Sequence, residues 1–138
     1  MVAAYVHPEQ DITFTSENGV IGYAGIAADH EVDIDVVNAG IQYVTLKPGA
    51  AIVSHADSFA LIRSGMNDAT VLGCYEVDQH GAFASWRTST GAWDNLGGIG
   101  GAMDLAVCAQ NVWIAMEHTT RHGEPRLLEQ CKLPVTAV

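Results

Sequence analysis

The sequence predicts an α/β domain built on a mixed β-sheet with flanking helices. Short segments with the alternation and β-branched residues of strands are interleaved with segments of helical spacing, over short loops. Several strand-like segments follow one another directly, which favours a mixed sheet over a purely parallel one. The 138 residues are 49% hydrophobic and 16% charged, so residues 1–138 are expected to form a single domain.

The N-terminal third is predicted to be a short strand followed by loops. Asp11–Thr15 alternates in polarity and predicts a strand that runs into the turn formers of Ser16–Gly19. Glycines at positions 19, 22 and 25 are expected to keep the following chain irregular. Two further loops are expected, an acidic one over Asp29–Asp35 and a turn at Asn38–Gly40.

The middle of the chain is predicted to form two strands and a helix. Ile41–Leu46 predicts a strand that Lys47–Gly49 closes, and Ala50–Ser54 predicts a second one. Ala56–Arg63 has helical spacing, and Ser64-Gly65 provides its stop.

The C-terminal half begins with a predicted hairpin and a glycine-rich loop. Thr70–Val77 and Ala82–Trp86 predict strands around an Asp78–Gly81 turn. The loop Gly91–Gly101 leads into a predicted helix, Ala102–Gln110.

The remaining segments predict one more strand and an irregular tail. Asn111–Met116 is apolar and predicts a buried strand. Glu117–Val138 is polar and turn-rich, with one short amphipathic piece at Arg126–Cys131.

Charge and cysteine content restrict the partners and the compartment. The formal net charge of −10 argues against nucleic acid or an anionic membrane surface as a partner. Cys74, Cys108 and Cys131 are odd in number and widely spaced, which favours reduced thiols. The start has no signal-peptide pattern and no apolar stretch reaches membrane-spanning length, so a cytoplasmic location is expected.

A carboxylate at a strand end is the first candidate for chemistry. Glu17 lies in the turn Ser16–Gly19, directly after the first predicted strand, where α/β proteins often place functional side chains. Such a carboxylate could act as a nucleophile or a general base. Residue types alone favour the simpler interpretation, a solvent-exposed turn.

The second candidate is the glycine block Gly97–Gly101 before a predicted helix. Free N–H groups there could hold a phosphate or an oxyanion forming at an acyl carbon. The spacing does not match the dinucleotide fingerprint. An ordinary flexible loop explains the glycines equally well.

A third candidate, Glu117–His122, is rejected as a metal site. Two histidines four residues apart beside a glutamate are reminiscent of a zinc-binding helix. The order of the residues is wrong for that motif, and Gly123 and Pro125 follow at once. No metal is therefore predicted.

Three blocks, taken in order, resemble the β subunit of family I coenzyme A transferases, the group of succinyl-CoA:3-oxoacid and 3-oxoadipate CoA-transferases. Ser16–Gly22 (SENGVIG) looks like the family's Ser-Glu-Asn-Gly signature. Asn38–Arg63 is similar to the segment that follows it. Gly100–Leu105 (GGAMDL) and Met116–Thr119 (MEHT) resemble the late glycine block and the strand end beyond it.

The resemblance implies a CoA-transferase (NagB/RpiA-like) fold and assigns roles to particular residues. Glu17 would be the nucleophile, and Gly100 and Gly101 are the candidates for holding the oxyanion. Five further residues would contact CoA or substrate: Asn18, Gly19, Asn38, Ser54 and Ser58.

One position, one loop and both ends depart from the family pattern. Where the family commonly has a lysine that helps to hold CoA, this chain has Ile41, whose side chain cannot make that contact. The loop Arg87–Leu96 differs from the usual form and is expected to affect substrate choice. The family's usual first and last segments are absent, so the chain resembles a β subunit trimmed at both ends.

The implied reaction is a ping-pong transfer of CoA between a carboxylic acid and an acyl-CoA, through a glutamyl-CoA thioester on Glu17. No cofactor would be bound permanently, because coenzyme A is itself a substrate. The expected partner is the family's α subunit, which carries a glycine-rich CoA loop of its own. An acyl-CoA hydrolase that uses the same glutamate and a non-catalytic assembly subunit remain as alternatives.

Overall fold

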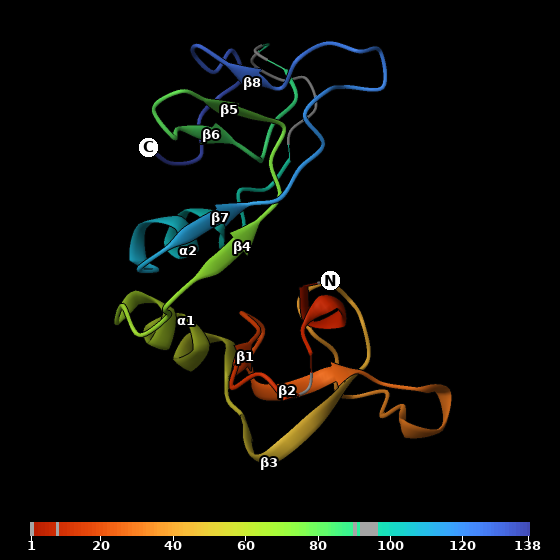
Figure 1. Cartoon of the computed structure of the whole chain (residues 1–138). Coiled ribbons are helices and arrows are strands. Elements are labelled where there is room, and N and C mark those ends of the chain that lie inside the picture. The colour runs from red at the N-terminus through yellow and green to blue at the C-terminus, as the bar shows by residue number, and fades with distance from the viewer. Residues whose placement is uncertain (1, 8, 90, 92–96) are drawn as a thin grey trace. The chain divides into compact units, whose positions relative to one another are not determined.

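The computed structural model describes residues 2–7, 9–89, 91 and 97–138, and confirms the mixed α/β class (Figure 1). The chain divides into two compact units, Met1–Ile62 and Arg63–Val138. Three small sheets and two α-helices are present among the described residues. That the two units form one domain stays a prediction.

The first unit is built on an antiparallel sheet with the strand order β1-β2-β3. Its strands are β1 (Phe14–Thr15), β2 (Val20–Ile26) and β3 (Val44–Ile52). Two short 3₁₀ turns accompany them: η1 (Val2–Tyr5) precedes β1, and η2 (Asp29–Glu31) lies between β2 and β3. The predicted first strand is therefore real but shorter than Asp11–Thr15, and it pairs with β2 as a hairpin.

The prediction that glycines would keep the chain irregular after position 19 is wrong. Gly22 and Gly25 lie inside β2, the central strand of this sheet. Gly22 has φ +81°, and the register of β2 against β3 shifts on either side of Tyr23. The glycines thus allow bulges in a continuous strand, which increases its twist without ending it.

The prediction of two strands around Lys47–Gly49 is also wrong, because β3 runs through this segment without a break. Pro48 is tolerated because β3 is an edge strand, where a missing N–H need not interrupt the ladder. Gly49 has φ +86° at the point where the register shifts, between the pairs Ile21–Ala51 and Tyr23–Leu46. A bend in the strand therefore replaces the expected turn.

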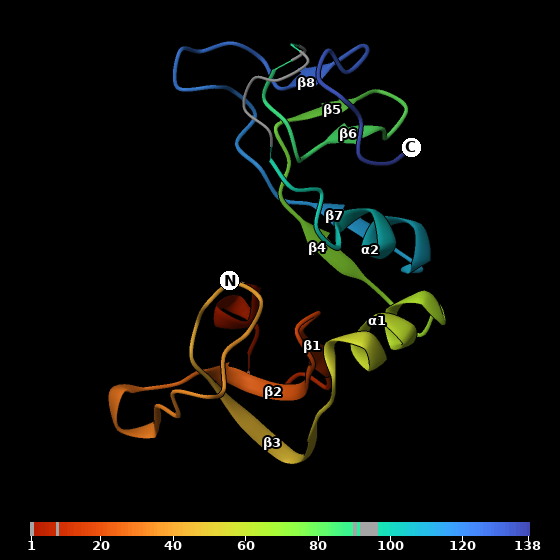
Figure 2. The same ribbon diagram turned by 180° about the vertical axis from the view of Figure 1, so that it is seen from behind.

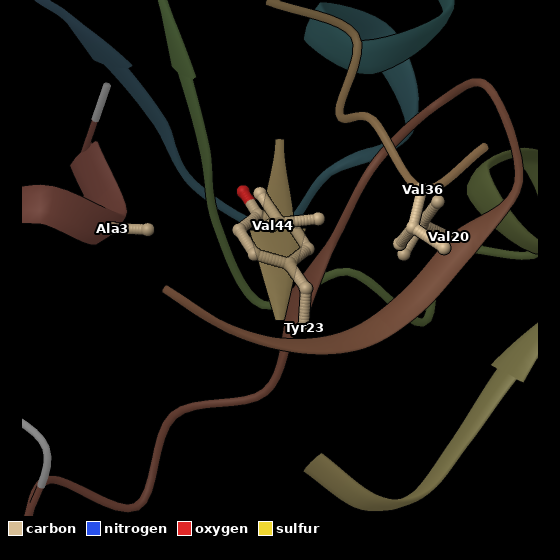
Figure 3. Close-up of a cluster of buried hydrophobic side chains, with 5 residues drawn as sticks. All are labelled: Ala3, Val20, Tyr23, Val36 and Val44. Carbon is tan, nitrogen blue, oxygen red and sulfur yellow. The ribbon is translucent and has the colours of Figure 1, made fainter. Parts of the chain in front are cut away.

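The core of the first unit is a cluster of five side chains, shown in Figure 3: Ala3, Val20, Tyr23, Val36 and Val44. Val44 is 2% exposed, and the Tyr23 ring stacks on Phe14 with 5.3 Å between ring centroids. Burial raises the pKa of the Tyr23 phenol. The cluster joins β2 and β3 to η1 and to the loop before β3, so it fixes the sheet that carries the turn after β1.

The predicted helix Ala56–Arg63 is confirmed as α1 (His55–Arg63). Ser58 and Ile62 form its buried face, and both are 4% exposed. The helix ends at Ser64-Gly65, where Gly65 has φ +76°, as expected for a glycine stop.

The second unit contains a parallel pair of strands, a three-stranded mixed sheet and a helix (Figure 2). β4 (Thr70–Leu72) pairs in parallel with β7 (Val112–Ile114), and the intervening chain includes α2 (Ala102–Cys108). The other sheet has the order β6-β5-β8. Its strands are β5 (Glu76–Asp78), β6 (Phe83–Ala84) and β8 (Leu127–Leu128).

The hairpin around Asp78–Gly81 is confirmed, but three predictions for this unit need correction. Thr70–Val77 is divided into β4 and β5, which belong to different sheets. β7 is not a buried strand, since Trp113 is 61% exposed. The segment Arg126–Cys131 contains β8, which pairs in parallel with β5, so the tail is less irregular than predicted.

Candidate functional site

Glu17 occupies the second position of a tight turn that joins β1 to β2. Gly19 N donates to Ser16 O (2.9 Å), and Ser16 N donates to Val20 O (2.8 Å). These two bonds close the four-residue turn at the end of the β1–β2 hairpin. The backbone on either side of Glu17 is therefore fixed. The predicted turn Ser16–Gly19 is thereby confirmed.

Gly19 is a position that only glycine fills without strain. Its φ is +114°, and a Cβ placed on it would lie 2.2 Å from Val53 O. Its carbonyl accepts a hydrogen bond from Val53 N (2.9 Å), at the end of β3. Gly19 therefore acts through its backbone, by bringing the turn against the chain that leads into α1.

The loop before β3 supports the turn from a second direction. Ala39 N donates to Ser16 Oγ (2.6 Å), and Asn18 Nδ2 donates to Val37 O (2.8 Å). Ser16 is 7% exposed, and the sequence marked it only as a turn former. Its hydroxyl is an organising group that residue type and local spacing could not have revealed.

Asn38 is the centre of this loop, although it was predicted to contact CoA or substrate. Its Oδ1 accepts from Gly40 N (2.9 Å) and Gln42 N (3.1 Å), and the residue is 5% exposed. Ile41 at the loop tip has φ +58° and is 88% exposed, an unusual conformation for a β-branched residue. The contacts of Asn38 therefore shape the loop that holds Ser16 and Asn18.

Ser54 and Ser58 lie at the start of α1. Ser54 Oγ accepts from Asp57 N (3.1 Å) and donates to Asp57 Oδ2 (2.8 Å), so it caps the helix. Ser58 Oγ donates to Ser16 O (3.3 Å). The helix thus supports the Glu17 turn from a third direction, and a direct contact of either serine with a ligand stays a prediction.

The Glu17 side chain is half-buried, and no hydrogen bond or ion pair joins its carboxylate to any of the described residues. The backbone beneath it is fixed by β3, by the Asn38 loop and by α1. A carboxylate on so rigid a base, with both oxygens available, is suited to attack on a bound electrophile.

The glycine turn of the second unit precedes α2. Gly100 has φ +54° and Gly101 is buried, and neither amide donates a hydrogen bond to a described residue. Gly97 packs against the Trp86 backbone, since a Cβ on it would lie 2.0 Å from Trp86 O. The N–H groups of Gly100 and Gly101 are able to donate hydrogen bonds to an anion. That these N–H groups face Glu17 stays a prediction. Residues 92–96 of the predicted glycine-rich loop lie outside the described residues.

One ion pair fixes α2 at its first turn. Arg63 Nε donates to Asp104 Oδ1 (2.8 Å). The hydrogen bond from Arg63 and the charge of that guanidinium hold the pKa of the Asp104 carboxyl below its ordinary value. This contact joins the end of α1 to the helix that follows the glycine turn.

Other parts of the described chain offer less chemistry. Two open hollows among the described residues of the second unit are lined by residues of β5, β8 and their neighbours, including the acidic Asp78 and Glu129. Within residues 2–7, 9–89, 91 and 97–138, no cluster of three potential metal ligands occurs. No helix there has the length and apolar character needed to cross a membrane.

The cysteines among the described residues are free thiols. Burial raises the pKa of the Cys74 thiol, which lies 3.3 Å from Met116 Sδ. Burial and the nearby Asp78 raise the pKa of Cys131. Thiols with raised pKa values are poor nucleophiles at neutral pH, so Cys74 and Cys131 are weak candidates for covalent chemistry.

A family model described as Coenzyme A transferase matches residues 1–137. The chain belongs to the coenzyme A transferase family. The resemblance drawn from the Ser-Glu-Asn-Gly turn and the late glycine block is thereby confirmed.

Relatives in this family are similar over nearly all of the chain. The B subunit of the 3-oxoadipate CoA-transferase of Pseudomonas putida is 41% identical over 138 residues, which are 100% of this chain and 63% of the relative. The B subunit of the succinyl-CoA:3-ketoacid coenzyme A transferase of Helicobacter pylori is 41% identical over 91% of this chain and 59% of its own length. A mitochondrial succinyl-CoA:3-ketoacid coenzyme A transferase 2B of Mus musculus is 38% identical over 99% of this chain, and the match covers 26% of the relative.

A solved structure supports the fold of this coenzyme A transferase chain. The crystal structure of the acyl-CoA transferase YdiF apoenzyme of Escherichia coli O157:H7 aligns with a TM-score of 0.61. The alignment covers 92% of this chain and 24% of that one, at 18% identity. The chain therefore spans less than two thirds of the relatives it matches.

Proposed function

We propose that this chain supplies the nucleophile of a CoA-transferase, which moves CoA between a carboxylic acid and an acyl-CoA through a thioester on Glu17. The supporting observation is the Glu17 turn itself. Three separate segments fix its backbone, while the carboxylate has no partner among the described residues. A carboxylate that makes no hydrogen bond or ion pair with the described residues adds nothing to the turn itself, which favours a role in chemistry.

The first half of the reaction follows from carboxylate chemistry. A Glu17 oxygen attacks the thioester carbonyl of the donor, the C–S bond breaks, and CoA leaves as a thiolate. The thiolate then attacks the glutamyl carbonyl of the mixed anhydride. The anhydride C–O bond breaks, the donor acid is released as a carboxylate, and a glutamyl-CoA thioester remains.

The second half reverses these steps with the acceptor. The acceptor carboxylate attacks the glutamyl-CoA thioester and expels the CoA thiolate, which then attacks the acyl carbonyl of the new anhydride. Glu17 is released as a carboxylate, and an acyl-CoA of the acceptor is formed. No proton is consumed and the activated bond is kept throughout, so no ATP is required.

Each addition places negative charge on a carbonyl oxygen, and the amides of Gly100 and Gly101 are the proposed donors for it. One such donor contributes about 10²–10³ in rate. Both the anhydride and the thioester are hydrolysed by water, so the reaction needs a closed site.

A partner protein is part of the proposal. The chain has a net charge of −10, and CoA also carries several negative charges. Because like charges repel, this chain alone is a poor binder of the CoA phosphates. Two of the relatives are named as B subunits, which supports assembly with an α subunit that provides much of the CoA site. Coenzyme A is then a substrate, and no permanently bound cofactor is proposed.

The test is to trap the covalent intermediate. The protein that carries this chain, assembled with its partner, is incubated with an acyl-CoA, digested and examined by mass spectrometry. We expect CoA on the peptide that contains Glu17. Free acid released without any acceptor would indicate a hydrolase instead, and a complex that forms no adduct would indicate a non-catalytic assembly role.

Glu17→Gln should reduce transfer by at least about 10⁴-fold, because the amide keeps the size but is not a nucleophile. Since the carboxylate has no described partner, the free energy of unfolding should change by less than about 0.5 kcal/mol. Glu9→Gln, at an exposed glutamate before β1, is the matched control and should keep full activity. Normal turnover by Glu17→Gln would end the proposal.

A further inference from the structure

Two open hollows adjoin on the second unit, beside the strands β5 and β8. They have volumes of about 330 and 410 Å³, and Asp78, Gln79 and Glu129 line both of them. We call the combined surface, residues 77–80 and 127–130, the β8 hollow. A water molecule takes up about 30 Å³ of liquid, so the β8 hollow has room for side chains of another molecule.

The floor of the β8 hollow is fixed by backbone pairing. β8 pairs in parallel with β5. Val77 N donates to Arg126 O (3.0 Å), and Gln79 N donates to Leu128 O (3.0 Å). The hollow is therefore preformed, and little further ordering is needed when another molecule binds there.

One end of the β8 hollow is apolar. Val77, Leu127 and Leu128 line it, and Leu127 is 51% exposed. β8 is an edge strand of its sheet, as Figure 1 shows, so no strand of the described chain pairs with its outer side. An exposed leucine on a sheet edge is a surface that a second chain is able to cover.

The other end of the β8 hollow is acidic. It contains Asp78 and Glu129, and no lysine or arginine is among the described residues that line it. Three backbone amides donate to the Asp78 carboxylate, those of His80, Ala82 and Cys131. Desolvation opposes its charge, but these hydrogen bonds hold the pKa of the Asp78 carboxyl below its ordinary value. The carboxylate therefore stays ionised at neutral pH.

Charge decides which molecule the β8 hollow accepts. Anions such as CoA and carboxylic acids are repelled by the two carboxylates. A second copy of this chain also has a net charge of −10, so it meets the same repulsion. A segment with an apolar side chain beside a lysine or arginine matches both ends of the hollow.

We propose that the β8 hollow is a docking surface for a basic segment of the partner subunit, which inserts an apolar side chain against Leu127 and places a lysine or arginine beside Asp78 and Glu129. The inference rests on the proposed function, because that proposal includes the partner, and it names the surface through which this partner binds. It concerns a part of the second unit that contains none of the residues proposed for the transfer reaction.

The test is the affinity of the whole chain for its α subunit, measured by calorimetry. Leu127→Asn should weaken binding by about 30-fold, because the apolar contact at the centre of the surface is lost. Glu129→Lys should weaken it by at least about tenfold, because a basic group then meets a basic group. The wild-type Kd should rise with added salt, and the Kd of Glu129→Gln should rise less steeply.

Matched controls use the same substitutions at exposed positions away from the β8 hollow. Ile34→Asn replaces a 75% exposed isoleucine of the first unit, and Glu124→Lys reverses an exposed charge that does not line the hollow. Both should change the affinity by less than about twofold. Unchanged urea midpoints for Leu127→Asn and Glu129→Lys would show that their losses are not due to unfolding.

Three outcomes would overturn the proposal. The first is unchanged affinity of both Leu127→Asn and Glu129→Lys. The second is an equal loss in the controls, which would indicate a general effect of surface polarity and charge. The third is a dimer of the isolated chain that Leu127→Asn dissociates, which would make a second copy the occupant.

Failure of the proposed function would be recognised separately by the trapping of glutamyl-CoA. A wild-type complex that forms the adduct, with unchanged affinity in the variants at the β8 hollow, would refute the docking surface alone. A complex that is weakened by Leu127→Asn and Glu129→Lys but forms no adduct would refute the transfer reaction and support the docking surface.

Discussion

Replacing Gly19 by alanine tests whether the Glu17 turn depends on a single backbone position. An alanine there must adopt φ +114°, and its Cβ would lie 2.2 Å from Val53 O. The clash is with backbone, so no side-chain rotation relieves it. Moving the turn away would break the bond from Val53 N to Gly19 O, now 2.9 Å.

The size of the effect follows from these two contributions. Holding a residue with a side chain at such a φ costs about 1–3 kcal/mol. The lost hydrogen bond adds about 1 kcal/mol. The free energy of unfolding of the first unit should therefore fall by about 2–4 kcal/mol. With a urea m-value of about 2 kcal/mol/M, the midpoint should move down by about 1–2 M.

The assay is urea unfolding followed by circular dichroism, with hydrogen exchange of the Ser16, Gly19 and Val53 amides as the local measurement. Gly25→Ala is the matched control in the same strand, because it has no positive φ and a Cβ there meets nothing within 4 Å. It should change stability by less than about 1 kcal/mol. If Gly19→Ala were as stable as Gly25→Ala and kept its amide protection, the account of the turn would be refuted.

Two more predictions concern the supporting contacts. Asn38→Ala should lower the free energy of unfolding by about 2–3 kcal/mol, because Gly40 N and Gln42 N lose their acceptor. Asn38→Asp keeps an acceptor oxygen and should cost less. Equal urea midpoints for the two variants would contradict this. The hydrogen bond from Arg63 lowers the pKa of Asp104, so this pair contributes stability above the ordinary aspartate pKa of about 3.9 and loses it as pH falls through the lowered value. The stability difference between the wild type and Asp104→Asn should therefore shrink as the pH is taken below about 4, and a difference that grew there would show the opposite sign.

Local sequence signals correctly predicted the elements whose ends are determined by nearby residues, such as turn formers or a glycine stop. Turn formers located the Ser16–Gly19 turn and the Asp78–Gly81 hairpin, and a helical pattern with a glycine stop located α1. The errors occurred where tertiary pairing decided the outcome. Pro48 and Gly49 indicate a turn in isolation, but β2 pairs with the chain on both sides of them and keeps β3 continuous.

The sequence singled out Glu17, and the support of its turn by Asn38 and Ser58 was not predicted; that these two residues contact a ligand stays a prediction. Asn38 and Ser58 were expected to contact ligand, and their described hydrogen bonds go to the backbone of their own loop and of the turn. Ser16 was not singled out, because its partner Ala39 lies 23 residues away.

The long-range origin of these contacts links the reactivity of Glu17 to the folding of its unit. The hydrogen bonds that hold the turn come from the end of β3, from the loop around Asn38 and from α1, at separations of 19 to 42 residues for the side-chain bonds. A local fragment containing the turn would keep only the two short-range bonds, from Gly19 N to Ser16 O and from Ser16 N to Val20 O. The carboxylate would then sample many directions, and the advantage of a fixed nucleophile would be lost. The whole first unit is therefore the smallest part of the chain expected to position Glu17.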